Sequence, residues 1–310
     1  MAERFISSAL LALGLGVTAW MGYPDTVEAS EDWRADDLWT INGSVSGVIG
    51  DYDDSNTRGS FYGSGLKMSF DYLDRGGFTL GYNYTHVDFK DGQGRDLDQA
   101  AYYASGRLQA RPDGARGTVI FRMDTHLVDN DDITGTSDGA YAVAPIIGFY
   151  NYDKSLYLDL GLTRSFYMND FRLMQLTPTV GFGFNEGSDW LQLRGFLIDS
   201  NNRSRSQGEE FTAALDIKYS HWFAPGNLLK IDQVSLGGLV GDRIHAVDPD
   251  AASMTNLSDV QTGSASISGS WRLGDVTNLT VLGGGDFYEN VPAKDSYRST
   301  YFFLNLSREW

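Results

Sequence analysis

The 310-residue sequence predicts an all-β chain that forms one transmembrane antiparallel up-and-down β-barrel, with fourteen strands expected and twelve as the alternative. Three observations predict this fold class. Segments of roughly 10 to 13 residues alternate apolar and polar side chains with a period of two. Short and long connections alternate along the whole chain. Tryptophans gather near the ends of the predicted strands, as they do in barrels that cross a bilayer.

The first thirty residues are typical of an export signal. Arg4 precedes an apolar run over residues 5–21, and Ala29 and the valine two positions before it suit the cleavage site of signal peptidase. We therefore expect residues 1–29 to be a cleaved signal peptide and residues 30–310 to form a single barrel domain. An uncleaved anchor is the alternative, because the apolar run approaches the length of a spanning helix.

The alternation is clearest between residues 211 and 219. Apolar side chains occupy every odd position there, whereas Thr212, Asp216 and Lys218 occupy even positions. Successive side chains of a strand point to opposite faces, so such a segment has one apolar face and one polar face. The segments are longer than the strands of most globular proteins and have the length that a tilted membrane strand requires.

The connections predict the strand count. Six short turn signals, such as those at 224–227 and 274–277, alternate with seven longer polar stretches, such as 199–210 and 242–259. Six turns and both termini on one side of a membrane give seven hairpins, hence fourteen strands. Tight turns on one side and long loops on the other are typical of outer-membrane barrels.

Composition excludes several classes of function. The chain has no cysteine, so thiolate metal sites and cysteine nucleophiles are excluded, and its net charge of −17 argues against a nucleic-acid partner. The acidic stretches at 51–56 and 129–132 lack the glycine and the final glutamate of a calcium loop. We therefore expect no cofactor and no specific metal site, and only loose divalent bridging from these loops to lipopolysaccharide phosphates.

Tryptophan positions give an independent indication. Five tryptophans lie at the end of a predicted strand that carries a short turn or a terminus, which predicts one membrane-interface girdle. Three of them also share parity with the apolar face of their strand, and two do not. The girdle candidates are Trp39, Trp190, Trp222, Trp271 and Trp310.

The last segment, residues 300–310, carries a resemblance. Phe302, Leu304, Leu306 and the terminal Trp310 share one parity. This segment resembles the closing strand of Gram-negative outer-membrane proteins, which end in an aromatic residue read by the barrel assembly machinery. In size and strand count the chain resembles the monomeric fourteen-stranded porins. The resemblance implies an outer-membrane location, contact with lipid and lipopolysaccharide, recognition of the last strand by that machinery, and a monomer.

Strand parity also predicts which charged side chains face the lumen. Six basic groups, five acidic groups and one histidine are expected there, together with many small polar residues. A barrel of this strand number can enclose an aqueous passage, and acidic loops at its mouth would favour the entry of cations. The lumen candidates are Lys67, Asp71, Arg107, Arg122, Asp124, His126, Asp159, Arg194, Asp216, Lys218, Lys230 and Asp232.

The function expected from these features is a porin-like channel for passive diffusion of small hydrophilic solutes. Aromatic side chains of lumenal parity leave open oligosaccharide uptake or polysaccharide export, and a secretion or assembly partner could plug the barrel. An outer-membrane hydrolase is the least favoured reading. It would need a nucleophile beside a base, and His126 with Asp124 on the same face is the best candidate base.

Overall fold

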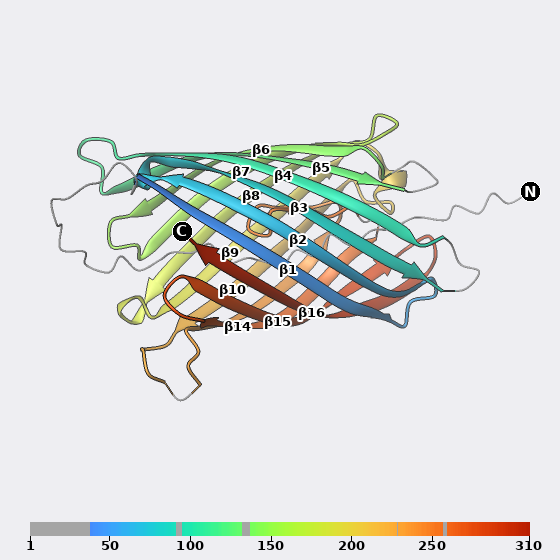
Figure 1. Ribbon diagram of the computed structural model, residues 1–310. Coiled ribbons are helices and arrows are strands. Elements are labelled where there is room, and N and C mark those ends of the chain that lie inside the picture. The colour runs from blue at the N-terminus through green and yellow to red at the C-terminus, as the bar shows by residue number, and fades with distance from the viewer. Residues whose placement is uncertain (1–37, 91–94, 132–136, 228, 257–258) are drawn as a thin grey trace, which may run out of the picture.

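The computed structural model describes residues 38–310, apart from 91–94, 132–136, 228 and 257–258. These residues form one closed antiparallel barrel of fourteen strands, which confirms the predicted fold class and strand count (Figure 1). Each strand pairs with its neighbours in the chain, and β1 pairs with β16 to close the sheet. The predicted signal peptide over residues 1–29 lies outside the described residues.

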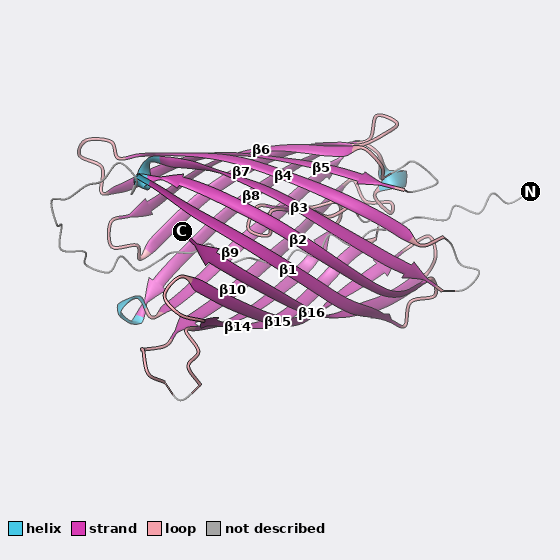
Figure 2. Cartoon of the chain, viewed as in Figure 1, coloured by secondary structure: helices cyan, strands magenta, loops and turns pink. Residues whose placement is uncertain are grey.

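The strands have the following bounds. The barrel consists of β1 (Trp39–Asp53), β2 (Arg58–Tyr72), β3 (Gly76–Phe89), β4 (Leu97–Ala110), β5 (Gly117–Asn130), β6 (Ala140–Asn151), β7 (Leu156–Phe166), β8 (Arg172–Phe184), β9 (Asp189–Ser200), β10 (Phe211–Trp222), β11 (Gln233–Arg243), β14 (Val260–Arg272), β15 (Thr277–Asn290) and β16 (Asp295–Glu309). A separate two-stranded hairpin consists of β12 (Val247–Asp248) and β13 (Ser253–Met254), and three single-turn 3-10 helices are η2 (Leu73–Arg75), η3 (Asn185–Gly187) and η4 (Arg203–Arg205) (Figure 2).

The two ends of the barrel differ in their connections. The near end is where β1 begins and β16 ends, on the left in Figure 1, and it carries the turns at 73–75, 152–155 and 185–188. The far end carries longer connections, above all residues 244–259. Two far-end loops are shorter than the sequence predicts. The paired strands continue to Asp53 and to Asn290, so only four residues connect each of these hairpins.

The C-terminal residue takes part in closing the barrel. The backbone N–H of Trp310 donates to the carbonyl of Ile41 at 2.8 Å, and the N–H of Ile41 donates back to Trp310 at 3.0 Å. The indole packs over Gly43 of β1, where a Cβ atom would stand 3.0 Å from the ring. The final residue therefore binds the first strand through both its backbone and its side chain.

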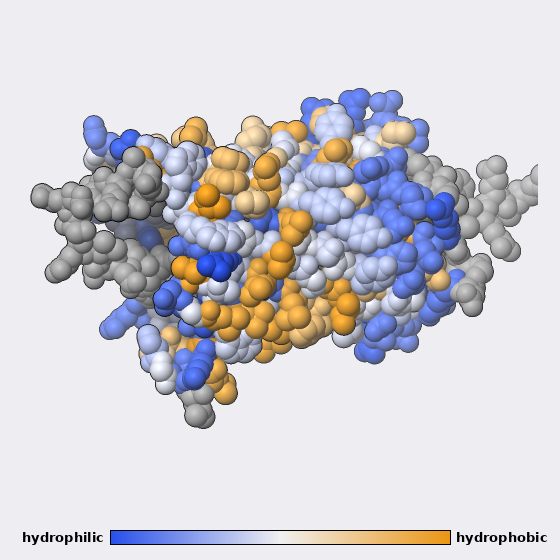
Figure 3. Space-filling view, in the orientation of Figure 1, coloured by the Kyte–Doolittle hydropathy of each residue, from blue (hydrophilic) through white to orange (hydrophobic). Residues whose placement is uncertain are grey.

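The outer surface of the barrel is apolar. Outward side chains such as Val45, Leu66 and Ile267 are exposed by 51%, 58% and 56%. Figure 3 shows apolar residues gathered around the middle of the barrel wall and hydrophilic residues at the far end, on the right. Exposure of this much apolar surface is unfavourable in water and favourable in a bilayer. No helix among the described residues has the length and apolar character needed to cross a bilayer.

Most buried apolar side chains lie inside the barrel, in two clusters towards its far end. One cluster joins β1, β2, β3, β15 and β16 through residues such as Tyr52, Phe61 and Tyr297. Beside it, Arg58 forms a fully buried ion pair with Asp259 at 2.6 Å. The second cluster joins β5, β6 and β8 to β11 with the 244–259 connection, through residues such as Phe196 and Val247. In this second cluster, residues of the 244–259 connection pack against the inside of the barrel wall.

Candidate functional site

The connection between β11 and β14 folds into the lumen instead of extending from the barrel. We call residues 244–256 of this connection the inner loop. The inner loop contains the β12–β13 hairpin, whose tip lies at residues 249–252. Both flanking strands have a bulge where the loop begins and ends, between Val240 and Arg243 and between Gln261 and Gly263. Bulges bend a strand, and Gly241 adopts a φ of 99° that a side chain would strain.

Apolar contacts explain why the inner loop turns inward. Ala246, Val247 and Met254 are no more than 2% exposed, and they pack against wall residues that include Phe196 and Ile198. Without the inner loop, this part of the wall would present an apolar patch to the lumen. Burial of such surface is favourable by about 25 cal/mol per Å². The loop and this side of the wall therefore stabilise each other.

Gln175 of β8 holds the backbone of the hairpin. Its amide nitrogen donates to the Val247 carbonyl at 2.6 Å, and its carbonyl accepts from the Val247 N–H at 2.9 Å. On the other arm of the inner loop, the Asn256 side chain donates to the carbonyl of Ser137 at 2.6 Å. Buried backbone groups that lie outside regular sheet structure need such partners. These bonds hold both arms of the inner loop.

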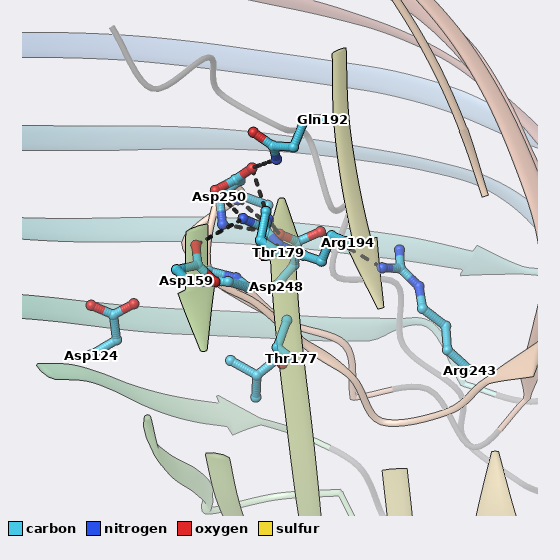
Figure 4. Close-up of polar contacts among 12 residues, drawn as sticks. Asp124, Asp159, Thr177, Thr179, Gln192, Arg194, Arg243, Asp248 and Asp250 are labelled. Carbon is cyan, nitrogen blue, oxygen red and sulfur yellow. Dashed lines mark hydrogen bonds and ion pairs between the residues drawn. The ribbon is translucent and has the colours of Figure 1, made fainter. Parts of the chain in front are cut away.

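Arg194 of β9 is the centre of a buried ion-pair cluster (Figure 4). Its guanidinium contacts both carboxylate oxygens of Asp250, each at 2.8 Å, and its Nε donates to the Thr179 hydroxyl at 2.9 Å. Asp248 and Asp159 lie further from it, at 3.6 and 3.9 Å. Because the Arg194 side chain is only 3% exposed, this bidentate pair is desolvated and directional. It anchors the hairpin tip on the wall.

The carboxylates of the tip are ordered by their own loop. Asp248 accepts hydrogen bonds from the backbone N–H groups of Asp250 and Ala251, at 3.0 and 3.2 Å. Burial alone would raise the pKa of Asp250, but the Arg194 guanidinium outweighs burial and the net shift of this pKa is downward. Gln192 donates a further hydrogen bond to Asp250 at 2.8 Å. Asp250 is therefore ionised when the loop is docked.

Residues of the inner loop line two cavities in the lumen. One has a volume of about 110 Å³ and lies between the inner loop and the walls formed by β1 to β5 and β16. The other has a volume of about 70 Å³ and lies on the side of β9 to β11, β14 and β15. Each cavity is large enough to hold several water molecules. The docked inner loop therefore occupies part of the lumen and lines a cavity on each side.

Ten of the twelve lumen candidates lie on barrel strands. Several of them pair with one another: Arg107 donates to Asp71 at 2.6 Å, and Arg122 contacts Asp124 at 3.2 Å. Asp159 accepts from the hydroxyl of Tyr157 at 2.7 Å and lies near Arg194. Asp216 and Lys218 line the smaller cavity, and Lys67 and His126 line the larger one.

Lys230 and Asp232 are not on a strand. β10 ends at Trp222 and β11 begins only at Gln233, so both residues belong to the near-end connection, and Lys230 is exposed. The expectation that they face the lumen therefore stays a prediction. Glycine and the turn residues near 224–227 obscure the alternation there, and parity carries no meaning outside a strand.

The five tryptophans lie at the near end but face different ways. Trp39 and Trp310 are exposed by 48% and 62% on the outward face, and Trp271 shares the outward parity of Ile267. Trp190 instead packs over Gly181 of β8, where a Cβ atom would stand 2.2 Å from its ring. Gly181 and Trp222 have inward parity in their strands. The single outward girdle predicted from the sequence is therefore wrong for Trp190 and Trp222.

The candidate catalytic group His126 makes no hydrogen bond to a nucleophile in the described part of the chain. Its ring packs against Tyr103 with centroids 5.1 Å apart, and its Nε2 has no hydrogen-bond partner among the described residues. Asp124 is bonded to Ser105 at 2.7 Å and paired with Arg122. A general base must reach the proton that it abstracts, and no hydrogen bond among the described residues joins His126 to such a group.

One group of side chains could hold a metal ion. Ligand atoms of His86, Asp88 and Asp96 lie within 4.8 Å of one another near the far end of β3. Both ring nitrogens of His86 already bond to carboxylates, Nδ1 to Asp98 at 2.8 Å and Nε2 to Asp88 at 3.2 Å. Direct ligation by His86 would therefore have to displace one of these bonds, so the geometry favours a hydrogen-bonded network.

Sequence reasoning missed the residues of the inner loop. The 242–259 stretch reads as a polar external loop, and Asp248 and Asp250 do not stand out among the other loop acids. The available signal is the apolar content of the loop, with Ile244, Val247 and Met254 set among polar residues. Apolar residues that recur in a long loop indicate that the loop packs against another surface.

Because His245 is buried when the inner loop is docked, we expect docking of this loop to depend on pH. Its ring is buried between Tyr167 and Phe171, with Arg205 over the Phe171 ring, and burial lowers the pKa of His245 to about 3. An undocked loop would expose the histidine, with a pKa near its usual 6.5. Docking should therefore weaken as the pH falls below about 6.5, by up to about 1.4 kcal/mol per pH unit. Single-channel recordings from pH 7.5 to 4.5 should show more frequent openings at low pH.

The matched control for this prediction is His245→Phe, which keeps the aromatic packing and removes the titration. The variant should lose most of the pH dependence in this range. An unchanged profile in His245→Phe would assign the effect to other groups in the lumen.

Comparisons with known proteins agree with the fold. No model of a known protein family matches the chain, and no curated protein matches it. The chain is similar to a solved structure of the TodX deltaS2S3 mutant monoaromatic hydrocarbon channel, at 8% identity and a TM-score of 0.52, over 88% of this chain and 90% of that one. It is also similar to the Acinetobacter baumannii outer membrane protein Omp33, at 9% identity and a TM-score of 0.48, over 87% and 99% of the two chains. At 8% identity the likeness to the first of these structures shows a shared fold and nothing more.

Proposed function

We propose that the chain is an outer-membrane channel through which small hydrophilic solutes diffuse passively, with the inner loop as its size filter. The observation that carries the proposal is the polar lumen divided by a docked loop. The outward face is apolar over the middle of the barrel, whereas the inward face carries paired charges and two cavities with polar walls. A closed wall of this kind separates a wet interior from lipid.

The inner loop sets the size of solute in this proposal. The cavities beside it have volumes of about 110 and 70 Å³, and the anchors at Arg194 and Gln175 fix the loop between them. Ions and very small polar solutes suit such a passage, and oligosaccharides do not unless the loop undocks. The proposal therefore favours a narrow channel over oligosaccharide uptake or polysaccharide export.

The remaining assignments belong to the same proposal. Residues 1–29 serve as a cleaved export signal, and the barrel functions as a monomer in contact with lipid and lipopolysaccharide. The strand that ends in Trp310 is the recognition element for the barrel assembly machinery, which fits the contact of this residue with β1. No catalytic step is assigned, because His126 makes no hydrogen bond to a nucleophile among the described residues.

Two measurements test the proposal together. Purified barrel in a planar bilayer should give stepwise ionic currents. Liposomes that contain it should swell in glycerol faster than in a disaccharide of equal osmolarity, because the inner loop excludes the larger solute. A barrel that gives no current steps between pH 4.5 and 7.5 contradicts the channel, and equal swelling rates contradict the size filter.

A further inference from the structure

The two cavities beside the inner loop differ in charge. The smaller one is lined by three basic residues and by Asp216, Asp248, Asp250 and Asp286. The larger one has a single charged residue, Lys67, in its lining, and no carboxylate lines it. A solute that passes on the larger side therefore meets one positive charge among neutral polar groups.

Lys67 has no partner in the described part of the chain. It points inward from β2, and its register neighbours on the two adjacent strands are Ser44 and Gly81. No hydrogen bond or ion pair joins its ammonium group to another described residue. Asp71, another inward-facing charged residue of β2, does have a partner, since Arg107 donates a hydrogen bond to it at 2.6 Å. An unpaired ammonium in a confined lumen attracts a counter-ion.

Neutral hydrogen-bonding groups lie beside Lys67. A Cβ atom on Gly65, the preceding inward position of β2, would stand 2.3 Å from Asn83 Oδ1 and 2.6 Å from Ser46 Oγ. These two side chains therefore lie over Gly65, on the same inward face as Lys67. An amide and a hydroxyl can both donate to an anion. Glycine at position 65 leaves the space that this group requires.

We propose that Lys67, with Asn83 and Ser46, forms a binding site for small monovalent anions, such as halides and short carboxylates, in the larger passage. This inference rests on the proposed channel function and names the class of solute favoured by one of its two routes. The ammonium supplies the charge, and the amide and hydroxyl replace part of the hydration shell of the anion. The inner loop forms the opposite side of the passage through Ala251 to Met254.

The experiment compares reversal potentials of the full-length barrel in a planar bilayer under a gradient of KCl and, separately, of potassium acetate. Lys67→Gln should lower the permeability of anions relative to K⁺ by about fivefold, the scale set by one nearby charge in a partly aqueous pore. Lys67→Glu should shift the ratio further in the same direction. Both salts should respond, because halide and carboxylate share the single negative charge.

Two further variants make the test specific. Lys154→Gln removes an equal charge from an exposed near-end turn and should leave the permeability ratio unchanged. Lys218→Gln removes a charge from the smaller cavity and should shift the ratio much less than Lys67→Gln.

If a conducting Lys67→Gln barrel keeps the wild-type ratio of anion to K⁺ permeability, the proposed anion-binding site is overturned, whereas the channel function is not. Equal shifts in Lys67→Gln and Lys218→Gln overturn the anion-binding site too, because lumen charge in general would then set the selectivity. A wild-type barrel that does not conduct overturns the channel function itself.

Discussion

Replacement of the inner loop by a short linker is expected to raise the single-channel conductance severalfold. Arg243 and Gln261 are register partners on adjacent strands, so a Gly-Ser linker in place of residues 246–256 can close the hairpin without distortion of the barrel. The inner loop lies in the lumen and lines a cavity on each side, so its removal is expected to join the two cavities into one passage. Recordings of wild type and variant in the same bilayer and salt measure the difference.

A matched control shortens a connection that does not enter the lumen. Deletion of residues 224–227, in the exposed near-end turn between β10 and β11, should leave the conductance at its wild-type value. Equal conductance for the inner-loop variant and wild type would mean that the constriction lies elsewhere.

Arg194→Met is expected to undock the inner loop without deleting it. The substitution leaves the carboxylate of Asp250 buried without its bidentate cation, and loss of one partner of a buried ion pair costs about 3–5 kcal/mol. Arg243 pairs with Asp248 at 3.6 Å and forms no ion pair with Asp250 in the described structure. It therefore does not replace the two bonds that Arg194 makes to Asp250. We expect a higher and noisier current, together with faster amide hydrogen exchange over residues 244–256.

Two variants define what this result means. Arg172→Met breaks an exposed ion pair with Asp170 and should change neither the current nor the exchange, because exposed pairs contribute little. Arg194→Met combined with Asp250→Leu removes both charges and should restore slower exchange. Slow exchange over the inner loop in Arg194→Met alone would show that apolar packing is sufficient to dock it.

The sequence predicts the barrel well because the wall depends on local rules. Alternation along β10, from Phe211 to Trp222, follows directly from one face in lipid and one face in a lumen. The strand count follows from the connections, since each turn reverses the chain. These features need no knowledge of distant contacts.

The inner loop could not be predicted in the same way. Its position depends on Arg194 and Gln175, which are more than fifty residues away in the chain and meet the loop only after the barrel closes. Long loops carry little local information about their conformation. Parity also loses its meaning where a strand ends, so it does not decide which way the side chains of Lys230 and Asp232 face.

The facing of Trp190 depends on a neighbouring strand. Gly181 on β8 leaves a space that the indole fills, and nothing within β9 alone indicates it. Parity does separate Trp190 and Trp222 from the other three tryptophans. Proximity to a turn is a weaker guide to membrane contact than strand parity.

The central claim is that the tip of the inner loop lies in the conducting path, and cysteine modification tests it most directly. The chain contains no cysteine, so Ala251→Cys, in the lining of the larger cavity, introduces a unique thiol. Leu215→Cys on the outward face, where Leu215 is 41% exposed, is the control. A negatively charged methanethiosulfonate reagent should lower the current of Ala251→Cys in steps that persist after the reagent is washed out and are reversed by dithiothreitol. It should leave Leu215→Cys unaffected. A steady current through Ala251→Cys barrels that mass spectrometry shows to be fully modified would contradict the claim.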